Sequence, residues 1–348
     1  MSKILIIRFS AIGDVAMTVP VVHSFANQYP QHQIMVLSRP NMAALFASLP
    51  SNVTFKGVDV KKDYKGFSGL NRLYRELASE KFDYIADFHD VIRTKYLRLR
   101  FLLSGKKIAH IDKGRAGKKA LTRAKNKIKV QQATSFQRYA DVLKRLGMPI
   151  KMDFQTIYPN GKADTSAFLS ITGEKGTDRW VGIAPFATHA GKIYPQASME
   201  QVIKQLDAQP NLRIFLFGGG KKEVDILSAW AKKYPSATCI AGQLKMKEEL
   251  ALMSHLDVMV SMDSGNMHLA SLVNTPVVSI WGATHPLAGF LGWNQSEKNV
   301  VQADMPCRPC SVYGNKPCMR NDYACLNRIA SETIVKQVYS IIDSKTKT

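Results

Sequence analysis

The stretch that most restricts the fold of this chain is residues 258–282, VMVSMDSGNMHLASLVNTPVVSIWG. Two apolar runs of strand composition, 258–260 and 277–281, flank a polar turn and a segment at 266–273 that is long enough for two helical turns. Strand, helix and strand in such short succession predict a β-α-β unit, whose two strands run parallel in one sheet. We therefore expect an α/β protein.

The turn Asp263-Ser264-Gly265 inside this unit is a candidate ligand site. In open α/β sheets, ligands bind where the carboxyl ends of the strands lead into helix N-termini. The backbone N–H groups of residues 265–267 would suit a phosphate group. Asp263 and Ser264 are equally good N-caps, and a capped crossover helix without a ligand explains the same residues. The turn alone leaves both interpretations open.

The same alternation of strands and helices runs through the whole chain in two series. The first begins with the apolar run at 3–9 and ends with a helical segment at 135–146, and the second begins with a strand at 180–184. Between them, residues 150–177 lack periodicity and contain several glycines, as expected of a connection between domains. Each series predicts a doubly wound, Rossmann-like domain, with a cleft between the two.

The length of 348 residues suits two such domains of about 150 residues each. We expect an N-terminal domain at 1–165, a C-terminal domain at 178–328, and a C-terminal helix and tail at 329–348. No apolar run approaches the ~20 residues that cross a bilayer, and the run at 4–7 is too short for a signal peptide. We therefore expect a cytoplasmic protein.

The positive charge is concentrated in one block. The chain carries 48 Lys and Arg against 27 Asp and Glu, and residues 93–129 alone hold 14 basic residues and one acid, Asp112. Such a block favours a polyanionic partner, which could be nucleic acid, an anionic membrane surface or a phosphorylated substrate. The alternative is a solvated basic face that keeps the protein soluble.

Asp14 is a candidate general base in the first half. It follows Gly13 at the carboxyl end of the first strand, and the same carboxylate could instead cap the next helix. Pro20 lies either in the first turn of that helix or at a kink within it.

In the second half, three loops that follow strands carry polar residues. Residues 184–192 supply Thr188 and Lys192, the glycines at 218–220 precede Glu223, and the third loop is the turn at Asp263. Lys192 would neutralise phosphate oxygens, and Glu223 would accept hydrogen bonds from ribose hydroxyls. The glycine run lacks the spacing of a dinucleotide fingerprint or a P-loop, Lys192 could be a surface charge, and His268 could be a core histidine.

Three segments together resemble a known family. The order of IIRFSAIGDVAMTVP, APFATHAGKIYP and SMDSGNMHLASLVNTPVVSIWGATHP is similar to that of the heptosyltransferases, glycosyltransferase family 9, which have the GT-B fold. The resemblance implies that Asp14 is the general base and that Thr188 and Lys192 contact the donor diphosphate. It implies a ribose contact for Glu223, and the remaining implied donor-binding residues are Asp263, Ser264, Gly265 and His268.

The resemblance also implies the reaction and the partners. The expected activity is an inverting transfer, without a metal or other cofactor, of a heptose-like sugar from a nucleotide diphosphate donor, ADP-heptose. The acceptor would be the acidic inner core of lipopolysaccharide or a related glycolipid, and the first domain would hold it. The protein would be a monomer that associates peripherally with the inner membrane face. The basic residues expected to contact the acceptor are Arg93, Arg98, Lys118, Lys119 and Arg123.

Two other functions and one metal site stay open at this stage. A nucleic-acid-binding protein could use the basic block, although the block has few aromatic residues for stacking on bases and no recognised reader motif, so we expect no nucleic-acid partner. A GT-B epimerase or hydrolase could act on the nucleotide sugar alone. The spacing of Cys307, Cys310, Cys318 and Cys325 suggests structural zinc, but the second pair lacks the usual knuckle spacing.

Overall fold

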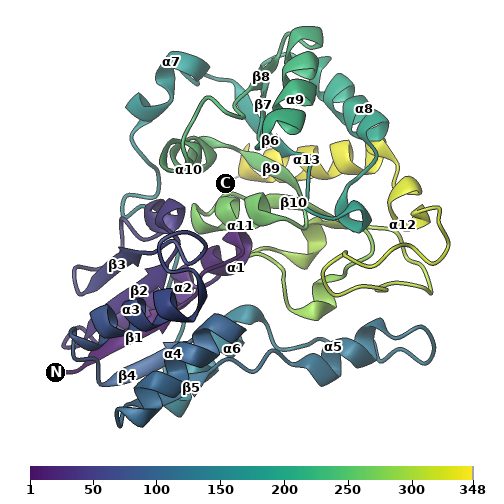
Figure 1. The fold of residues 1–348 in the computed structure, drawn as a ribbon. Coiled ribbons are helices and arrows are strands. Elements are labelled where there is room, and N and C mark those ends of the chain that lie inside the picture. The colour runs from purple at the N-terminus through teal and green to yellow at the C-terminus, as the bar shows by residue number, and fades with distance from the viewer. Residues whose placement is uncertain (347–348) are drawn as a thin grey trace. The chain divides into compact units, whose positions relative to one another are not determined.

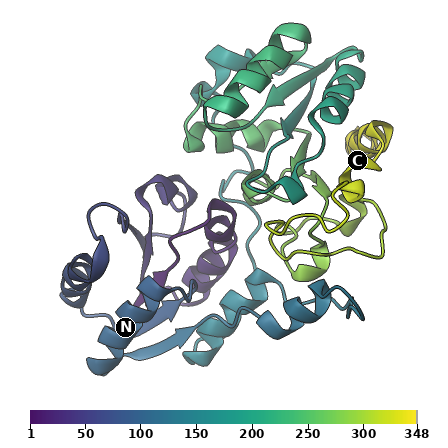
Figure 2. The same cartoon turned by 45° about the vertical axis from the view of Figure 1, so that its right-hand side comes forward.

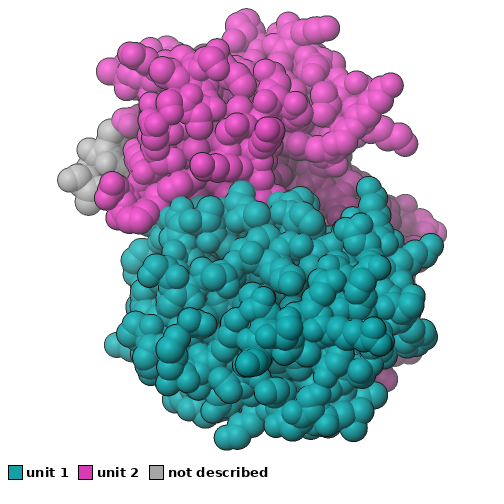
Figure 3. All heavy atoms as spheres, turned by 60° about the vertical axis from the view of Figure 1, so that its left-hand side comes forward, with its two compact units in different colours: residues 1–114, 133–157 teal, residues 115–132, 158–348 magenta. Residues whose placement is uncertain are grey.

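The computed structural model describes residues 1–346 and divides the chain into two compact units (Figure 3). Unit 1 comprises Met1–Gly114 and Ala133–Ile157, and unit 2 comprises Arg115–Gln132 and Tyr158–Thr348. The segment 115–132, which the sequence places in the first domain, therefore clusters with unit 2. The main division lies between residues 157 and 158, and the domain bounds expected from the sequence stay predictions.

Unit 1 is built on a parallel sheet with the strand order β3-β2-β1-β4-β5 (Figure 1). Its strands are β1 (Lys3–Ile7), β2 (Gln33–Ser38), β3 (Val53–Gly57), β4 (Tyr84–Asp87) and β5 (Lys107–His110). Its helices are α1 (Ile12–Ala16), α2 (Val19–Gln28), the 3-10 helix η1 (Pro40–Leu45), α3 (Gly66–Ala78), α4 (Ile92–Leu103) and α6 (Ser135–Arg145).

The connections of unit 1 place helices on both faces of its sheet. The crossover from β1 to β2 and the crossover from β4 to β5 run in opposite directions along the sheet. Because such crossovers are right-handed, α2 and α4 cover opposite faces. Accordingly, α3 packs against α4, and α2 packs against α6. The core on the α3 and α4 side includes Leu5, Ile7, Leu73, Leu97 and Phe101.

Unit 2 has a parallel sheet in the order β11-β10-β9-β6-β7-β8. Its strands are β6 (Arg179–Ala184), β7 (Leu212–Leu216), β8 (Ala237–Cys239), β9 (Val258–Met262), β10 (Val277–Trp281) and β11 (Val300–Gln302). Its helices are α5 (Arg115–Thr122), α7 (Leu169–Thr172), α8 (Gln196–Asp207), α9 (Lys221–Lys233), α10 (Met246–His255), α11 (Gly265–Leu272), α12 (Ala324–Asn327) and α13 (Ser331–Thr346). Short 3-10 helices are η2 (Thr165–Ala167), η3 (Ala190–Lys192), η4 (Pro286–Ala288) and η5 (Glu297–Asn299).

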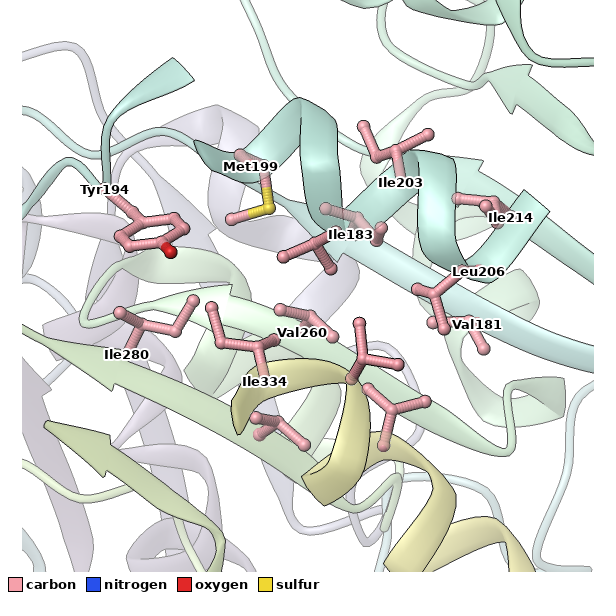
Figure 4. Packing of buried hydrophobic residues seen from close by; sticks show 14 of the residues in the cluster. Val181, Ile183, Tyr194, Met199, Ile203, Leu206, Ile214, Val260, Ile280 and Ile334 are labelled. Carbon is pink, nitrogen blue, oxygen red and sulfur yellow. The ribbon is translucent and has the colours of Figure 1, made fainter. Parts of the chain in front are cut away.

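The main core of unit 2 lies between its sheet and helices α8 and α13. Figure 4 shows Val181, Ile183 and Val260 of the sheet against Met199 of α8 and Ile334 of α13. The C-terminal helix thus belongs to this core. Of the tail expected after it, residues 347–348 lie outside the described part of the chain.

The structure confirms the α/β class and two doubly wound parallel sheets. It also confirms the predicted β-α-β unit: β9 and β10 pair in parallel, α11 connects them, and every residue of both strands is buried. Burial on both faces explains why these strands are continuously apolar rather than alternating. Pro20 lies at the start of α2, where its missing N–H costs no helical hydrogen bond.

The connection between β2 and β3 contains the short 3-10 helix η1, Pro40–Leu45, rather than a longer α-helix. Pro50 disfavours helical backbone at Leu49, which limits how far a helix can extend in this connection. Among the helices of residues 1–346, none combines the length and apolar character that crossing a membrane requires.

Candidate active site

In unit 1, Asp14 lies beyond the carboxyl end of β1, on the short helix α1. One of its carboxylate oxygens accepts the backbone N–H of Ala11 at 3.1 Å and lies 2.7 Å from Nη2 of Arg8. The Arg8 side chain is only 9% exposed, whereas that of Asp14 is 34% exposed. The carboxylate is therefore anchored from inside by a guanidinium while remaining accessible to a substrate hydroxyl, as a general base requires.

His89 is a neighbour of this pair that sequence reasoning missed. It is buried, and its Nδ1 lies 3.3 Å from the backbone N of Phe9, which donates to it. Burial, together with the positive charges of Arg8 and Lys113, lowers the pKa of His89 to about 3. The ring is thus neutral, with its proton on Nε2. Arg8 was also missed, although a charge inside the apolar run KILIIRF is an available signal.

The two predicted acceptor residues on α4 differ in solvent exposure and in ion pairing. Arg98 is only 15% exposed, and its guanidinium lies 3.4 Å from Asp87 and 3.2 Å from Asp90, so both of its ends face carboxylates. Asp87 is fully buried at the end of β4. Arg93, in the first turn of α4, is exposed. Only Arg93 of the two presents its charge to solvent.

The remaining predicted acceptor residues, Lys118, Lys119 and Arg123, belong to unit 2. Lys118 is buried with its ammonium 4.2 Å from the centre of the Phe290 ring, while Lys119 and Arg123 are exposed. The structure therefore divides the basic block between the two units. Seven of its 14 basic residues lie in 115–132.

In unit 2, three strand-end loops converge on Lys192. Its Nζ lies 3.0 Å from Oδ2 of Asp263, and Thr284 donates its hydroxyl to the same oxygen at 2.7 Å. The Lys192 side chain is 17% exposed. These residues follow β6, β9 and β10, which are neighbours in the sheet, so parallel pairing brings them together at one edge. Thr284 carried no distinctive signal in the sequence.

The structure does not support the interpretation that Asp263 and Ser264 serve only to cap the next helix. Ser264 is the N-cap residue of α11, and no side chain donates or accepts a capping hydrogen bond there. Asp263 instead turns towards Lys192. Gly265 begins the helix, and His268 is buried within it. The first turn of α11 therefore keeps its N–H groups and positive dipole end for an anion.

A loop from the cysteine-containing segment covers the stem of Lys192. Gly314 has a positive φ of 75°, and a side chain there would collide with the aliphatic part of Lys192. The carbonyl oxygen of Gly191 accepts the N–H of Ala283 at 2.8 Å, and a side chain at Gly191 would collide with the backbone of Gly314. Both glycines are required by close backbone approach.

Arg308 fixes the loop after β10. Its side chain is buried and its guanidinium donates to the carbonyl oxygens of Trp281, Gly282 and Thr284. Burial lowers the pKa of Arg308. Because these carbonyls flank the Thr284 hydroxyl, Arg308 holds the loop that orients Asp263. It is a positioning residue that the sequence did not reveal.

Glu223 and Thr188 lie at the edges of this site. Oε2 of Glu223 accepts the N–H of Gly219 at 2.8 Å, at the start of α9. Thr188 is exposed in the loop that precedes η3 and Lys192. Glu223 keeps a second carboxylate oxygen for a ligand hydroxyl, and Thr188 is accessible from solvent.

The cysteines form no evident metal centre. Cys307, Cys310, Cys318 and Cys325 are free thiols. Within residues 1–346, no group of three or more His, Cys, Asp or Glu side chains is placed to hold a metal ion. Burial raises the pKa of Cys325 to about 11. The zinc interpretation therefore gains no support from the described residues.

Known proteins resemble this chain along most of its length. Residues 70–318 match the family model described as glycosyltransferase family 9 (heptosyltransferase). Lipopolysaccharide heptosyltransferase 3 of Escherichia coli is 25% identical over 299 residues, which cover 83% of this chain and 85% of the relative. A family 9 glycosyl transferase of Veillonella parvula DSM 2008 has a TM-score of 0.75 at 18% identity, with 99% and 98% of the two chains covered. The E. coli ADP-heptose lipopolysaccharide heptosyltransferase II has a TM-score of 0.70 at 17% identity, with 99% of each chain covered.

Proposed function

The chain belongs to glycosyltransferase family 9, the heptosyltransferases, and on that premise we propose that it transfers a heptose from ADP-heptose to the acidic inner core of lipopolysaccharide or a related glycolipid. The relatives named above, one of them an ADP-heptose enzyme, support the donor and the acceptor class. We further propose that the protein acts as a monomer at the cytoplasmic face of the inner membrane.

The observation that carries this proposal is the cluster of Lys192, Asp263 and Thr284 at the carboxyl edge of the unit 2 sheet. Lys192 supplies a partly buried ammonium next to the N-terminus of α11, and both attract a diphosphate. Asp263 orients the ammonium through its own contact with Thr284. Glu223 and Thr188, at the rim, would contact the ribose and the phosphates.

The chemistry follows from where the charges lie. Asp14 accepts the proton of the acceptor hydroxyl, and the resulting oxygen attacks the anomeric carbon of the donor. The bond between that carbon and the phosphate oxygen breaks, and ADP leaves with its new negative charge stabilised by Lys192 and α11. Attack on the face opposite the leaving group inverts the anomeric configuration. Arg8 holds Asp14 without competing for the proton, because a guanidinium stays protonated.

Thermal stabilisation by nucleotide sugars tests the donor directly. A ligand present at 100 times its dissociation constant adds about 2.7 kcal/mol to the free energy of unfolding. We expect ADP-heptose to raise the melting temperature and Lys192→Ala to remove most of that rise. The exposed Lys232→Ala is the matched control, because Lys232 lies on α9 at its last turn. Stabilisation by UDP- or GDP-sugars alone, or release of free heptose without any acceptor, would contradict the proposal.

A further inference from the structure

The exposed apolar side chains of unit 1 gather on α3 and α4. Among the described residues, five large apolar side chains on these two helices are exposed: Phe67, Ile92, Leu99, Leu102 and Leu103. Their exposed fractions run from 53% for Leu99 to 83% for Ile92. The helices pack against each other, and the Phe67 ring lies 5.7 Å from that of Tyr96 on α4. We call these five residues the α3–α4 face (helices labelled in Figure 1).

The spacing on α4 makes this face continuous. Leu99 follows Ile92 by about two helical turns and Leu103 follows it by about three, so the three side chains lie along one side of the helix. The buried residues Thr94, Leu97 and Phe101 lie along the opposite side, against the sheet. An ordinary surface helix is polar on the side away from the core. On α4 that side is apolar, which indicates an interaction surface.

Basic residues flank the apolar side chains along the chain. Lys61, Lys62 and Lys65 are exposed just before and at the start of α3, and Arg93 and Lys95 are exposed on the first turn of α4. Lys107 is exposed just beyond the end of α4. Of the nearby acids, Asp63 is exposed, while Asp90 already faces Arg98 and Lys95. The face therefore combines apolar side chains with a surplus of positive charge.

We propose that the α3–α4 face docks on an anionic phospholipid bilayer, with its apolar side chains in the boundary between headgroups and acyl chains and its lysines on lipid phosphates. Anionic bilayers bind proteins that present apolar side chains together with Lys and Arg. This inference rests on the proposed function, because a glycolipid acceptor is anchored in a bilayer.

The place of this face within unit 1 fits that role. α4 begins at Ile92, just beyond the carboxyl end of β4, and β4 pairs with β1, which leads to Asp14. The first turn of α4 and the candidate base therefore share one edge of the sheet. An acceptor whose lipid part stays in the bilayer would present its sugar hydroxyls at that edge.

Sedimentation with vesicles tests the proposal. The probes are vesicles of phosphatidylcholine with about one third phosphatidylglycerol and vesicles of phosphatidylcholine alone. We expect the full chain to sediment with the anionic vesicles. The variant Leu99→Ser/Leu102→Ser/Leu103→Ser should lower the partition constant at least about tenfold. The variant Lys62→Gln/Lys65→Gln should lower it about tenfold or more on anionic vesicles only.

The matched control is Leu169→Ser/Met319→Ser, which removes two exposed apolar side chains of unit 2. It should bind vesicles as the parent chain does. Equal vesicle binding by the triple serine variant and the parent chain would overturn the proposal. So would finding that the parent chain is a dimer and that this variant is a monomer, because a second copy of the chain would then cover the α3–α4 face. Stabilisation by ADP-heptose is measured in parallel. If ADP-heptose did not stabilise the chain but the chain still bound vesicles, the proposed function would be contradicted and the proposed docking surface would not.

Discussion

At the scale of single residues, the two halves of the proposed reaction use the same device, a cation paired with a carboxylate. In unit 1, the buried Arg8 holds an accessible Asp14, so the carboxylate is the reactive partner. In unit 2, the buried Asp263 holds the more exposed Lys192, so the ammonium is the reactive partner. In each pair the buried member fixes the exposed one, which reduces the reorganisation needed when substrate charge develops.

Replacing the candidate base tests the unit 1 half of this scheme. Asp14→Asn keeps an oxygen that can accept the Ala11 N–H but removes the ability to take a proton. We expect kcat to fall by about 10²–10⁴-fold with donor stabilisation unchanged. Asp141→Asn, at an exposed carboxylate on α6, is the control and should keep full activity. Wild-type turnover by Asp14→Asn would remove Asp14 from the mechanism.

Glu249 makes stability depend on pH. Burial raises its pKa to about 7 from an ordinary value of 4.5. The unfolded chain releases this proton at lower pH than the folded chain, so the free energy of unfolding falls as pH rises from about 4.5 to about 7 and stays reduced above that. We expect Glu249→Gln to raise the melting temperature by about 2–4 °C at pH 8 and by less at pH 5. The measurement is a thermal melt at both values.

Glu297→Gln is the comparison for that experiment, because Glu297 is exposed. It should change the melting temperature little at either pH. Equal stabilisation by Glu249→Gln at pH 5 and pH 8 would show that the carboxyl charge is not what costs stability.

At the scale of elements, α5 and the irregular segment after it are held within unit 2 by a few specific contacts. Lys118 lies over the Phe290 ring, Gln132 donates its N–H to the carbonyl of Leu287 at 2.9 Å, and Lys127 donates to the carbonyl of Pro309 at 2.8 Å. Figure 2 shows the same segment, in blue-teal, beside the yellow-green loops that follow β10. Half of the basic block is thereby joined to the loops that shape the Lys192 site.

Removing the aromatic contact should release this segment. Phe290→Ala removes the ring under Lys118 and the partner of Tyr313. We expect limited trypsin digestion to cut after the exposed Arg123 and Lys125 several times faster, because local opening precedes cleavage. Met319→Ala, at an exposed side chain of the same unit, should leave the digestion rate unchanged. An unchanged rate in Phe290→Ala would show that other contacts hold α5.

The elements also show what the sequence can predict. Strands buried on both faces, such as β9 and β10, are continuous apolar runs, so their order and type were predictable, and the loops after them marked the site. The sequence could not predict the roles of Thr284, Arg308 and Gly314. Each acts through a contact with a residue distant in sequence, and single residues of these types carry no pattern. The attachment of 115–132 to unit 2 was hidden for the same reason.

At the scale of the whole molecule, the positive charge is shared between the two units, although along the chain it is concentrated in the first half. The sequence places most of the surplus in the first half, but seven basic residues and no acid lie in 115–132, which belongs to unit 2. Both units therefore carry a positive field. Exposed charges act over about 10 Å at 0.1 M salt and about 3 Å at 1 M, whereas partly buried pairs such as Lys192 and Asp263 are screened less.

This difference predicts how salt affects the two substrates. Raising the salt concentration should increase the KM for the acidic acceptor several-fold while changing the KM for the donor little, because the exposed Lys119 and Arg123 are screened more than the partly buried Lys192. Lys119→Gln/Arg123→Gln should raise the acceptor KM at low salt and flatten its salt dependence. Lys232→Gln/Lys336→Gln removes the same charge from exposed positions elsewhere in unit 2 and should leave the salt dependence as it is. If both double variants behaved alike, net charge would matter and the basic segment 115–132 would have no specific role in binding the acceptor.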